Sequence, residues 1–448
     1  MANNLFYKMD SPRWKRYVYS IIGAEITTTT RFYDSCIQVS PLQHDPGLLY
    51  KSIECKKKAV KKNVNELKDL KNDTSKRTAL LYNGNFCYSS DIEKELKELN
   101  KCISSTDRII LVLYNPFIKF IYKIADHLGL RSGPLPPTFL THHDLSNITS
   151  LAGYEIVRIR PSVYLPFPIP LFSKMINKIF PVIPLIKHIS LVWVVFLRPI
   201  INLSDNPSLS IIIPARNEAG NIKNAIERLP DFNNTKVEVI FVEGNSQDDT
   251  WVRIQEIIIK GYSPLSLKAF KQNGKGKYDA VRMGFEKAEN EIITILDADL
   301  TMPPEYLNRY YDAFCNGFGD FINGNRLVYQ MDKEAMRPLN RIGNIFFAKI
   351  LSVILGLKIG DSLCGTKMFS RNDYERIVEW RKYFGDFDPF GDFEMLFAAS
   401  ELALGVQDIP IQYKARTYGS TQISRFRDGL QLFRMTWIGF FRLYLGKV

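Results

Sequence analysis

Cysteine pairs at metal or redox spacing, long apolar runs and a signal-peptide core are all absent from this sequence. The six cysteines show no C-x-x-C spacing, so we expect free thiols in a reducing compartment. The strongest apolar runs, Ile189–Leu197 and Ile350–Leu357, are much shorter than the about 18 residues that a spanning helix needs. The first twenty residues lack the apolar core of a secretory signal, which predicts a cytoplasmic protein.

Histidine is absent from the second half of the chain, because the last of the five histidines is His188. A general base in that half would therefore have to be an acidic side chain. No G-x-x-x-x-G-K-[ST] motif occurs either, which excludes a P-loop as the nucleotide site.

The chain of 448 residues is longer than one hydrophobic core usually organises, so two domains are expected. Its formal net charge of +12 indicates an anionic partner: a nucleic acid, an anionic membrane surface or a phosphorylated substrate. The lysine-dense segment Lys51–Arg77 has no interleaved aromatic residues, so we interpret it as a solvated helix rather than a nucleic-acid patch. No nucleic-acid partner is expected.

Residues 79–160 alternate between strand and helix patterns. Apolar, β-branched runs predict strands at Ala79–Tyr82, Ile109–Tyr114 and Tyr154–Arg160. The segments between them predict helices at Phe117–Leu128 and His143–Leu151. The first half is therefore expected to be a small α/β unit.

Three segments of this half resemble the later portion of class I S-adenosylmethionine-dependent methyltransferases: IILVLYNP (Ile109–Pro116), HLGL (His127–Leu130) and NITSLAGYEIVRIR (Asn147–Arg160). Such enzymes place a glycine-rich turn after the first strand, so that the backbone approaches the cofactor. Residues 1–200 hold six glycines, no two of them two positions apart. The resemblance therefore implies a degenerate methyltransferase-like domain at 1–200, poorly defined at 1–78, and no S-adenosylmethionine binding is expected.

Seven prolines within residues 161–199 exclude a long regular helix there. We predict Ile189–Leu197 as the last strand of the first domain, with a membrane-touching hairpin as the alternative. The polar, turn-rich residues 201–207 are expected to link the two domains.

The second half begins with a regular alternation of strands and helices, which predicts a mostly parallel sheet. The predicted strands are Leu209–Pro214, Val237–Glu243 and Leu267–Phe270, and the predicted helices are Asn217–Arg228, Thr250–Lys260 and Tyr278–Ala288.

A further strand, Ile292–Leu296, runs directly into Asp297-Ala298-Asp299. Residues two apart in an extended segment point to the same side, so Asp297 and Asp299 could share a divalent cation. An Asp-rich turn at the end of the strand is the alternative.

Three more loops follow the carboxyl ends of predicted strands, where open α/β sheets bind ligands. Asn217 and Glu218 could hydrogen-bond a ribose or a base. Glu243 and Asp248 follow the next strand, although helix capping also explains Asp248. The GKGK segment that ends at Lys277 lets the backbone approach a ligand and supplies ammonium groups for phosphate. With the two aspartates, this combination fits a nucleotide-diphosphate ligand.

Six segments in this order resemble family 2 glycosyltransferases of the GT-A fold, and specifically the dolichyl-phosphate or polyprenyl-phosphate sugar transferases. They are LSIIIPARNE (Leu209–Glu218), VEGNSQDDT (Val242–Thr250), GKGKYDAVRMGF (Gly274–Phe285), ILDADLTMPPEYL (Ile295–Leu307), DSLCGTKMFSR (Asp361–Arg371) and RTYGSTQI (Arg416–Ile423). The resemblance implies a Rossmann-like GT-A domain at 208–425, followed by an amphipathic helix at 426–448.

The resemblance further implies that Pro214, Ala215 and Glu218 line a nucleoside pocket and that Asp248 lies close to it. Where the family usually has Val-Asp-Asp-Gly-Ser, this sequence has VEGNS. The acid expected to read the base is therefore the longer Glu243, and the nucleobase of the donor stays open.

The same resemblance implies that Asp297 and Asp299 hold Mg²⁺ or Mn²⁺ on the donor diphosphate, with Lys277 nearby. A cation there would stabilise the charge that develops on the departing diphosphate.

On the acceptor side, Gln422 replaces the lysine of the family's late motif, which leaves Arg416 and Arg425 as the expected cations for a phosphate acceptor. A sugar hydroxyl acceptor would instead need a base. Of the acids in FDPFGDFEML (Phe387–Leu396), Glu394 aligns with the family's acidic position.

These observations predict a metal-dependent, inverting transferase that moves a sugar from a nucleotide-diphosphate sugar to a polyprenyl phosphate. The arginine-rich, apolar stretch Gly429–Gly446 suits a helix at an anionic membrane surface, which predicts a protein peripheral to the inner face of the membrane. A core or dimer helix is the alternative for that stretch. Transfer to a saccharide hydroxyl in cell-surface polysaccharide synthesis and an inactive scaffold or binding protein are the other functions left open.

Overall fold

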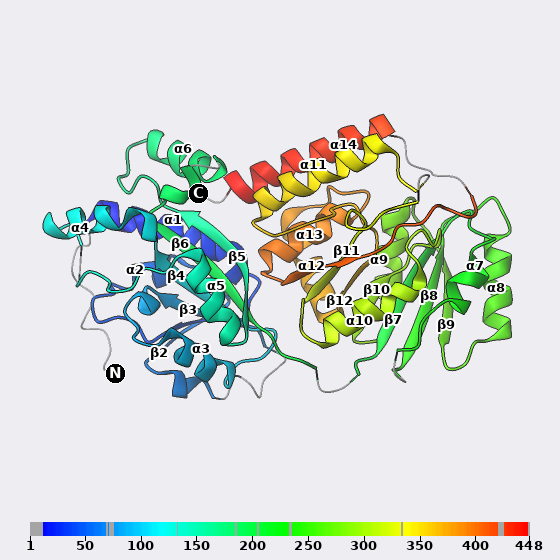
Figure 1. The fold of residues 1–448 in the computed structure, drawn as a ribbon, viewed down its shortest axis with the longest axis horizontal. Helices are drawn as coiled ribbons and strands as arrows, with labels where there is room; N and C mark the ends of the chain where they lie inside the picture. The colour runs from blue at the N-terminus through cyan, green and yellow to red at the C-terminus, as the bar shows by residue number, and fades with distance from the viewer. Residues whose placement is uncertain are drawn as a thin grey trace. The chain divides into compact units, whose positions relative to one another are not determined.

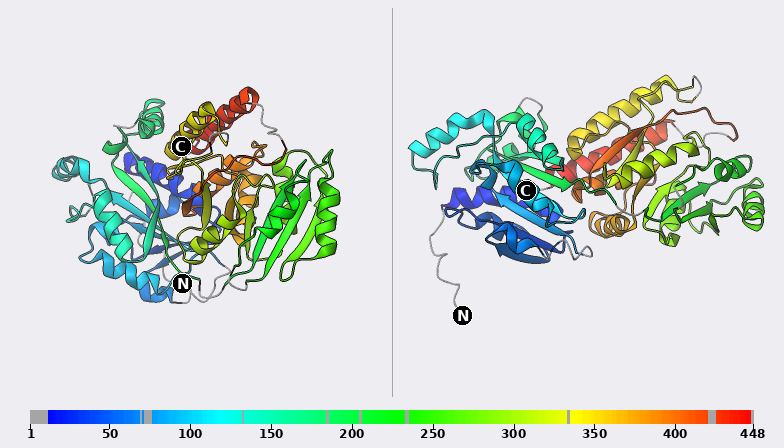
Figure 2. Two further views of the ribbon diagram at one scale, coloured as in Figure 1. Left: turned by 45° about the vertical axis from the view of Figure 1, so that its right-hand side comes forward. Right: turned by 60° about the horizontal axis from the view of Figure 1, so that its bottom comes forward.

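The computed structural model describes residues 12–68, 70, 76–131, 133–183, 186–203, 206–232, 235–332, 335–419 and 425–446. The chain forms two compact units, residues 1–201 with 440–448 and residues 202–439. Figures 1 and 2 show that each unit consists of a twisted sheet with helices packed on it.

The first unit contains a six-stranded mixed sheet in the order β2-β1-β3-β4-β6-β5. Strand β6 runs antiparallel to its neighbours β4 and β5, and the other neighbouring strands are parallel. The strands are β1 (Ser35–Val39), β2 (Lys57–Lys61), β3 (Thr78–Asn83), β4 (Arg108–Tyr114), β5 (Tyr154–Ser162) and β6 (Val192–Pro199). The helices are α1 (Arg13–Thr30), α2 (Leu48–Ser52), α3 (Ile92–Asn100), α4 (Lys119–His127), α5 (His142–Leu151) and α6 (Phe172–Ile179).

This arrangement confirms the expected α/β unit. The four strands predicted from apolar runs between residues 79 and 197 are β3, β4, β5 and β6, and the two predicted helices are α4 and α5. The likeness of this unit to methyltransferases stays a prediction.

The helix predicted over Lys51–Arg77 is wrong in the described part of that segment. Lys57–Lys61 forms the edge strand β2, which pairs with β1 in parallel. It is followed by a short 3-10 turn, η1 (Val64–Leu67). The side chains of β2 are mostly exposed, and lysines on an exposed edge strand discourage pairing with other chains. The lysine density therefore marks a sheet edge.

The second unit contains a seven-stranded sheet in the order β13-β11-β12-β10-β7-β8-β9. Only β12 runs antiparallel to its neighbours, which confirms the mostly parallel sheet. The strands are β7 (Leu209–Ala215), β8 (Val237–Glu243), β9 (Ser266–Lys271), β10 (Ile292–Ile295), β11 (Phe321–Asn325), β12 (Lys367–Ser370) and β13 (Val406–Pro410). The helices are α7 (Ile222–Glu227), α8 (Thr250–Lys260), α9 (Lys277–Lys287), α10 (Leu307–Cys315), α11 (Pro338–Leu355), α12 (Arg371–Phe384), α13 (Asp392–Glu401) and α14 (Arg425–Gly439).

The central strands of this sheet are buried on both faces, as their continuous apolar sequence requires. Ile211 and Val239 are fully buried in the core of the unit. On the other face α9 packs against β7, where a Cβ on Gly284 would overlap Ile212. This packing holds the carboxyl ends of β7, β8 and β10 at one edge.

Helix α7 begins five residues later than the predicted start at Asn217. Asn217 has a φ of 56°, in the left-handed region that a helix excludes. Its backbone N–H donates to Ser246 Oγ at 3.0 Å, so residues 216–221 form a loop tied to the end of β8. The chain therefore keeps Asn217 and Glu218 at the sheet edge.

Helices α11 and α14 lie side by side in Figure 1, and the ring of Phe433 contacts Phe346 and Phe347 between them. Helix α14 covers much of the predicted tail helix, and Phe440–Leu445 continues it as a π-helical turn, η8. By length and composition, α11 is just apolar enough to cross a membrane, although a third of it is buried in its unit. Arg341 and Lys349 interrupt its apolar sequence.

Candidate functional site

The carboxyl ends of β7, β8 and β10 place most of the predicted site residues at one edge of the second sheet. Strand β7 ends at Ala215 and β10 at Ile295, and their in-register pairing brings the loops after them together. Helix α9 begins at the same edge, directly after Gly276, whose φ of 93° favours glycine.

Asp297 forms an ion pair with Lys277, the first residue of α9. Lys277 Nζ lies 2.5 Å from Asp297 Oδ1, and both side chains are partly exposed. Burial alone would lower the pKa of Lys277, but the carboxylates of Asp297 and Asp392 outweigh this effect and raise the pKa well above its ordinary value. Lys277 is therefore a fixed cation beside the first aspartate of the pair.

Gly365 leaves the space that this ion pair occupies. A Cβ at Gly365 would overlap both Asp297 Oδ2 and Lys277 Nζ. The close approach explains a glycine at the centre of the DSLCGTKMFSR segment, although its φ does not require one.

Asp299 is paired with Arg416, which also contacts Glu218. Arg416 Nη2 lies 2.7 Å from Asp299 Oδ2, and its Nη1 lies 2.6 Å from Glu218 Oε1. The other oxygen of Asp299 accepts hydrogen bonds from the backbone N–H (3.1 Å) and the hydroxyl (2.8 Å) of Thr301. One guanidinium thus joins the loop after β10 to the loop after β7.

Glu218 is buried between Arg416 and Asn221. Its Oε2 accepts from Asn221 Nδ2 at 2.7 Å. Burial raises the pKa of Glu218 above its ordinary value, and the nearby charge of Arg416 opposes this shift. The carboxylate shares Arg416 with Asp299, and its role in a nucleoside pocket stays a prediction.

Asp248 ties two loops together. Its Oδ2 accepts from the backbone N–H of Ala219 at 3.3 Å and from Tyr418 Oη at 3.3 Å, and its Oδ1 accepts from the N–H of Thr250 at 3.0 Å. Burial alone would raise the pKa of Asp248, but these hydrogen bonds lower it. Asp248 therefore accepts an N–H at the start of α8, although the N-cap residue of that helix is Asp249, and its closeness to a nucleoside pocket stays a prediction.

Asn217 and Glu243 hold the loops after β7 and β8 against each other. Asn217 Oδ1 accepts from the N–H of Gln247 at 2.8 Å, and Glu243 Oε1 accepts from the N–H of Ser246 at 2.5 Å. Ala215 is buried, and its carbonyl accepts from the N–H of Gly244 at 2.9 Å. Pro214, within β7, is only half-buried. Roles in reading ribose or base stay predictions for these residues.

Glu394 lies in a buried network with residues of α9 and α12. Its side chain is fully buried in α13 and accepts from Arg381 Nε (2.6 Å), Arg282 Nη2 (2.8 Å) and Tyr278 Oη (2.6 Å). Both oxygens are therefore engaged by cations or a hydroxyl. This geometry supports a structural role and argues against the predicted general base.

Asp392 is the acid of the same segment that lies nearer the site. Its charge helps to raise the pKa of Lys277, and its Oδ1 lies 2.5 Å from Lys367 Nζ. Asp392 belongs to the same acidic segment, FDPFGDFEML, as the predicted Glu394, which follows it by two residues on α13. Successive side chains on an α-helix are rotated by about 100°, so Asp392 and Glu394, two positions apart, point to nearly opposite sides of α13.

Tyr418 and Asn221 were not predicted as site residues, although Tyr418 lies within the RTYGSTQI segment. The ring of Tyr418 lies against Gly220, where a Cβ would overlap it. The side chain of Arg425 lies outside the described part of the structure, as do residues 420–424.

Among the described residues there is no group of three or more His, Cys, Asp or Glu side chains that could hold a metal. Asp297 and Asp299 offer two carboxylates, each facing a cation of the chain. Such a pair suits a metal that is also bound by substrate phosphates, because Mg²⁺ is usually held by one or two carboxylates together with phosphate oxygens.

Part of this unit matches a known protein family. The family described as Glycosyl transferase family 2 matches residues 210–378. The chain is 26% identical over 221 residues to a dolichyl-phosphate hexose transferase from Haloferax volcanii, covering 49% of this chain and 89% of that protein. It is 33% identical over 121 residues to a dolichol-phosphate mannosyltransferase from Pyrococcus furiosus, but covers only 33% of that protein and 27% of this chain.

A solved structure of glucosyl-3-phosphoglycerate synthase from Mycobacterium tuberculosis, in complex with Mn²⁺, UDP and glucosyl-3-phosphoglycerate, is similar with a TM-score of 0.38 and 15% identity. The similarity covers 53% of this chain and 80% of that one. A likeness this distant carries no argument about ligand or metal here. The family match and the named hexosyltransferase relatives together show that the chain is a glycosyltransferase with a family 2 domain at residues 210–378.

Proposed function

We propose that this glycosyltransferase moves a hexose from a nucleotide-diphosphate sugar to a polyprenyl phosphate, with inversion at the anomeric carbon, at the inner face of a membrane. The observation that carries the proposal is the cluster of Lys277, Asp297, Asp299, Arg416 and Glu218 at one sheet edge. It combines carboxylates for a divalent cation with fixed cations for phosphate.

The donor diphosphate would bind between the start of α9 and the two aspartates. The amino end of a helix favours anions, because its first N–H groups have no partner within the helix. Lys277 stands at this end of α9 as a point charge for phosphate. Glu218, which shares Arg416 with Asp299, would accept hydrogen bonds from ribose hydroxyl or base amine groups.

Asp297 and Asp299 would hold Mg²⁺ or Mn²⁺ on the diphosphate. When bound, the cation would stabilise the negative charge that develops on the leaving nucleoside diphosphate. Lys277 is placed to add to this stabilisation without leaving its position.

A phosphate acceptor fits the residues around the cluster better than a hydroxyl acceptor. A phosphate oxygen is already anionic near neutral pH and needs no base, whereas a hydroxyl must lose its proton. Glu394 is held by two arginines, and Asp392 is paired with Lys367. The same acceptor class is supported by a relative that is a dolichyl-phosphate hexose transferase and of which this chain covers 89%.

An apolar, cationic surface on α11 and α14 supports work at a membrane. Leu339 and Ile342 of α11 and Leu430 and Trp437 of α14 expose more than half of their side-chain area. Arginines stand on or beside the two helices: Arg337, Arg341, Arg427 and Arg434. Exposed apolar area of this extent, bordered by cations, is typical of a membrane contact. We refer to the surface formed by these residues of α11 and α14 as the paired-helix surface.

The domain division stays part of the proposal: a methyltransferase-like domain at 1–200, a linker at 201–207, the transferase domain at 208–425 and an amphipathic helix at 426–448. The first domain is proposed to bind no S-adenosylmethionine. Calorimetric titration with S-adenosylmethionine is expected to give no heat of binding, and a measured saturable heat would contradict this part.

A panel of nucleotide-diphosphate sugars, incubated with the purified chain, Mg²⁺ or Mn²⁺ and a short polyprenyl phosphate in detergent, tests the proposed activity. We expect one donor to yield a glycolipid with an inverted anomeric configuration, detected by mass spectrometry and NMR. Asp299→Asn should remove the activity, whereas Asp312→Asn on α10 is a matched control. Failure of every donor with folded protein would refute the proposal.

A saccharide acceptor is the second candidate, favoured by the position of Asp392 near Lys277. The same panel with oligosaccharides in place of the lipid phosphate distinguishes the two. If a hydroxyl is the acceptor, Asp392→Asn should abolish transfer, because the hydroxyl would then lack a base.

A further inference from the structure

The first unit has an apolar surface of its own, formed by α4 and by the segment 164–179 that ends in α6. We propose that this surface docks the chain on a lipid bilayer that contains anionic headgroups. We define the α4–α6 surface by Phe117, Phe120 and Ile124 on one side and Leu171, Phe172 and Met175 on the other. It involves no residue of the transferase domain, and therefore none of the residues proposed to bind the donor or the acceptor.

Helix α6 is amphipathic, but its polar face is buried and its apolar face is exposed. Its buried residues are Ser173 and Asn177, whereas Phe172 and Met175 are exposed by 51% and 49%. A helix that packs on a protein core turns its apolar stripe inward. Helix α6 instead turns its polar stripe inward and presents its apolar stripe to the surroundings.

The inward polar side chains hold the loop before α6 in place. Asn177 Oδ1 accepts from the N–H of Tyr164 at 2.6 Å and of Leu165 at 3.1 Å, and Ser173 Oγ accepts from the N–H of Ile169 at 2.9 Å. At the tip of this loop Leu171 is 86% exposed and has a φ of 62°. A bulky leucine in the left-handed region is uncommon, so the loop holds this side chain outward against a local strain.

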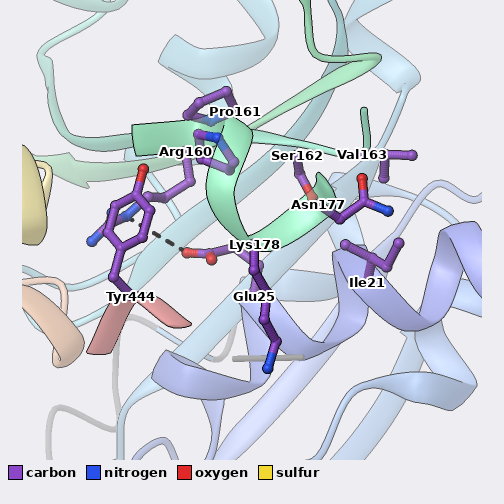
Figure 3. A pocket seen from close by; sticks show the side chains of 10 residues that line it. Ile21, Glu25, Arg160, Pro161, Ser162, Val163, Asn177, Lys178 and Tyr444 are labelled. Carbon is purple, nitrogen blue, oxygen red and sulfur yellow. Dashed lines mark ion pairs between the residues drawn. The ribbon is translucent and has the colours of Figure 1, made fainter. Parts of the chain in front are cut away.

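A small cavity lies beneath α6, and charged side chains stand among its lining residues. The cavity has a volume of about 40 Å³, and Figure 3 shows Asn177 and Lys178 among its lining residues together with Glu25, Arg160 and Tyr444. Arg160 Nε lies 3.8 Å from Glu25 Oε1, and its guanidinium lies over the ring of Tyr444. Packing the apolar stripe of α6 against these charged groups would cost their solvation. The outward direction of the stripe is therefore built into the unit.

Helix α4 contributes a second row of exposed apolar side chains. Phe117, Phe120, Ile124 and Leu128 follow helical spacing, and each is more than half exposed, whereas Tyr122 is the one buried residue of α4. Figure 1 shows α4 and α6 as two separate projections of the first unit. They are linked by contacts between η4 (Pro116–Ile118), which precedes α4, and η6 (Ile186–Ile189), which follows α6.

The charges around this surface select an anionic bilayer as the partner. Lys119 and Lys123 of α4 and Lys174 of α6 are exposed. Residues 161–191 contain no aspartate or glutamate. Lysines beside exposed apolar side chains suit an interface with anionic lipids. A second copy of the same surface would instead bring these lysines against one another.

Sedimentation of the full chain with phosphatidylcholine vesicles, with and without phosphatidylserine, tests the proposal. The variant Phe120→Ser/Ile124→Ser/Leu171→Ser/Met175→Ser should bind at least about tenfold more weakly, because each substitution removes apolar area from the lipid contact. Leu151→Ser at the end of α5, which is 65% exposed, is the matched control and should bind like wild type. Phe120→Leu should also bind like wild type, because it keeps an apolar side chain.

Lysine substitutions measure the electrostatic contribution to vesicle binding separately from the apolar one. Lys119→Gln, Lys123→Gln and Lys174→Gln should each weaken binding to phosphatidylserine vesicles by about fivefold and leave binding to phosphatidylcholine unchanged. Because the paired-helix surface is also proposed to contact a membrane, all variants are repeated in a Leu430→Ser/Trp437→Ser background. If the four serine substitutions did not weaken vesicle binding in this background, the proposal would be overturned.

Sedimentation velocity without lipid provides the second decisive measurement. A wild-type dimer that the four-serine variant breaks would show that a second copy covers the surface, and would overturn the proposal. Unchanged thermal melting of the variant establishes that it is folded. Hexose transfer to a short polyprenyl phosphate in detergent should be unaffected, so a failed transfer assay would contradict the proposed function and leave the vesicle result intact.

Discussion

Arg416 and Asp299 lie 117 positions apart in the sequence, yet Arg416 Nη2 is 2.7 Å from Asp299 Oδ2. The same guanidinium reaches Glu218, so the segment after β13 closes over the loops that follow β7 and β10. A planar guanidinium can bridge two carboxylates in this way, whereas an ammonium group is a single point charge. Arg416 is therefore placed to control the separation of Glu218 and Asp299.

Arg416→Ala should lower kcat/KM for the donor at least about tenfold, because two carboxylates lose the cation between them. Arg416→Lys should recover only part of the activity, since it cannot contact both partners at once. Steady-state kinetics with varied donor concentration provides the measurement. Arg253→Ala removes an exposed ion pair with Glu256 on α8 and is the control. Equal kinetics for Arg416→Ala and Arg253→Ala would contradict this assignment.

Divalent metal should bind tightly only together with a nucleoside diphosphate. Asp297 and Asp299 already face Lys277 and Arg416, so a free Mg²⁺ or Mn²⁺ would meet two fixed positive charges. The diphosphate adds negative charge and further oxygen ligands. Calorimetry is expected to show weak metal binding by the protein alone and saturable binding with UDP or GDP present. Tight binding of metal to the nucleotide-free protein would rule out this order.

Gly365→Ala should impair the ion pair between Lys277 and Asp297, because the new Cβ would overlap atoms of both. We expect a loss of transfer of about tenfold or more, with a smaller effect on the melting temperature. Gly343→Ala on α11 is the matched control, since a Cβ there meets no atom within 4 Å. Retained activity in Gly365→Ala would mean that Lys277 can shift without consequence.

Glu394→Gln should act on stability rather than on chemistry. It leaves Arg282 and Arg381 around a neutral side chain in a buried network, at a cost of about 3 kcal/mol in the free energy of unfolding. Asp386→Asn removes the exposed partner of the same Arg282 and should cost less than about 1 kcal/mol. Urea denaturation measures both. If fully folded Glu394→Gln lost all transfer activity, the result would instead support Glu394 as the general base.

Asp388 should make the stability depend on pH. Burial raises its pKa to about 6, although three backbone N–H groups at the start of α13 favour the ionised form. The folded chain therefore binds a proton more tightly than the unfolded chain does, and this stabilisation is lost as the pH rises from about 4 through 6. The loss amounts to at most about 3 kcal/mol.

Denaturation of wild type and Asp388→Asn at several pH values isolates this contribution. The difference in unfolding free energy between the two proteins should change across the window from about pH 4 to 7. A constant difference would show that Asp388 has an ordinary pKa.

Strands β7 to β10 of the second unit, and the residues at their carboxyl ends, were predictable from sequence, whereas β11, β12 and β13 were not predicted. The apolar run at Ile292–Leu296 and the polar residues that follow it are local signals, and the pairing of parallel strands brings such ends together. The predicted start of α7 failed because the backbone of Asn217 is held by Ser246, which is distant in sequence. The helix propensity of residues 217–228 carries no information on that contact.

The sequence by itself determined the order of the βα units and the carboxylates at one edge of the sheet, because strand patterns and terminal polar residues are local. Only the tertiary structure decided which cation faces which carboxylate, that Glu394 is buried and Asp392 lies nearer Lys277, and that α6 turns its polar side inward. These outcomes depend on long-range packing: a charged side chain finds its partner only after the sheet and its helices have formed, and the cost of burying it unpaired determines the choice.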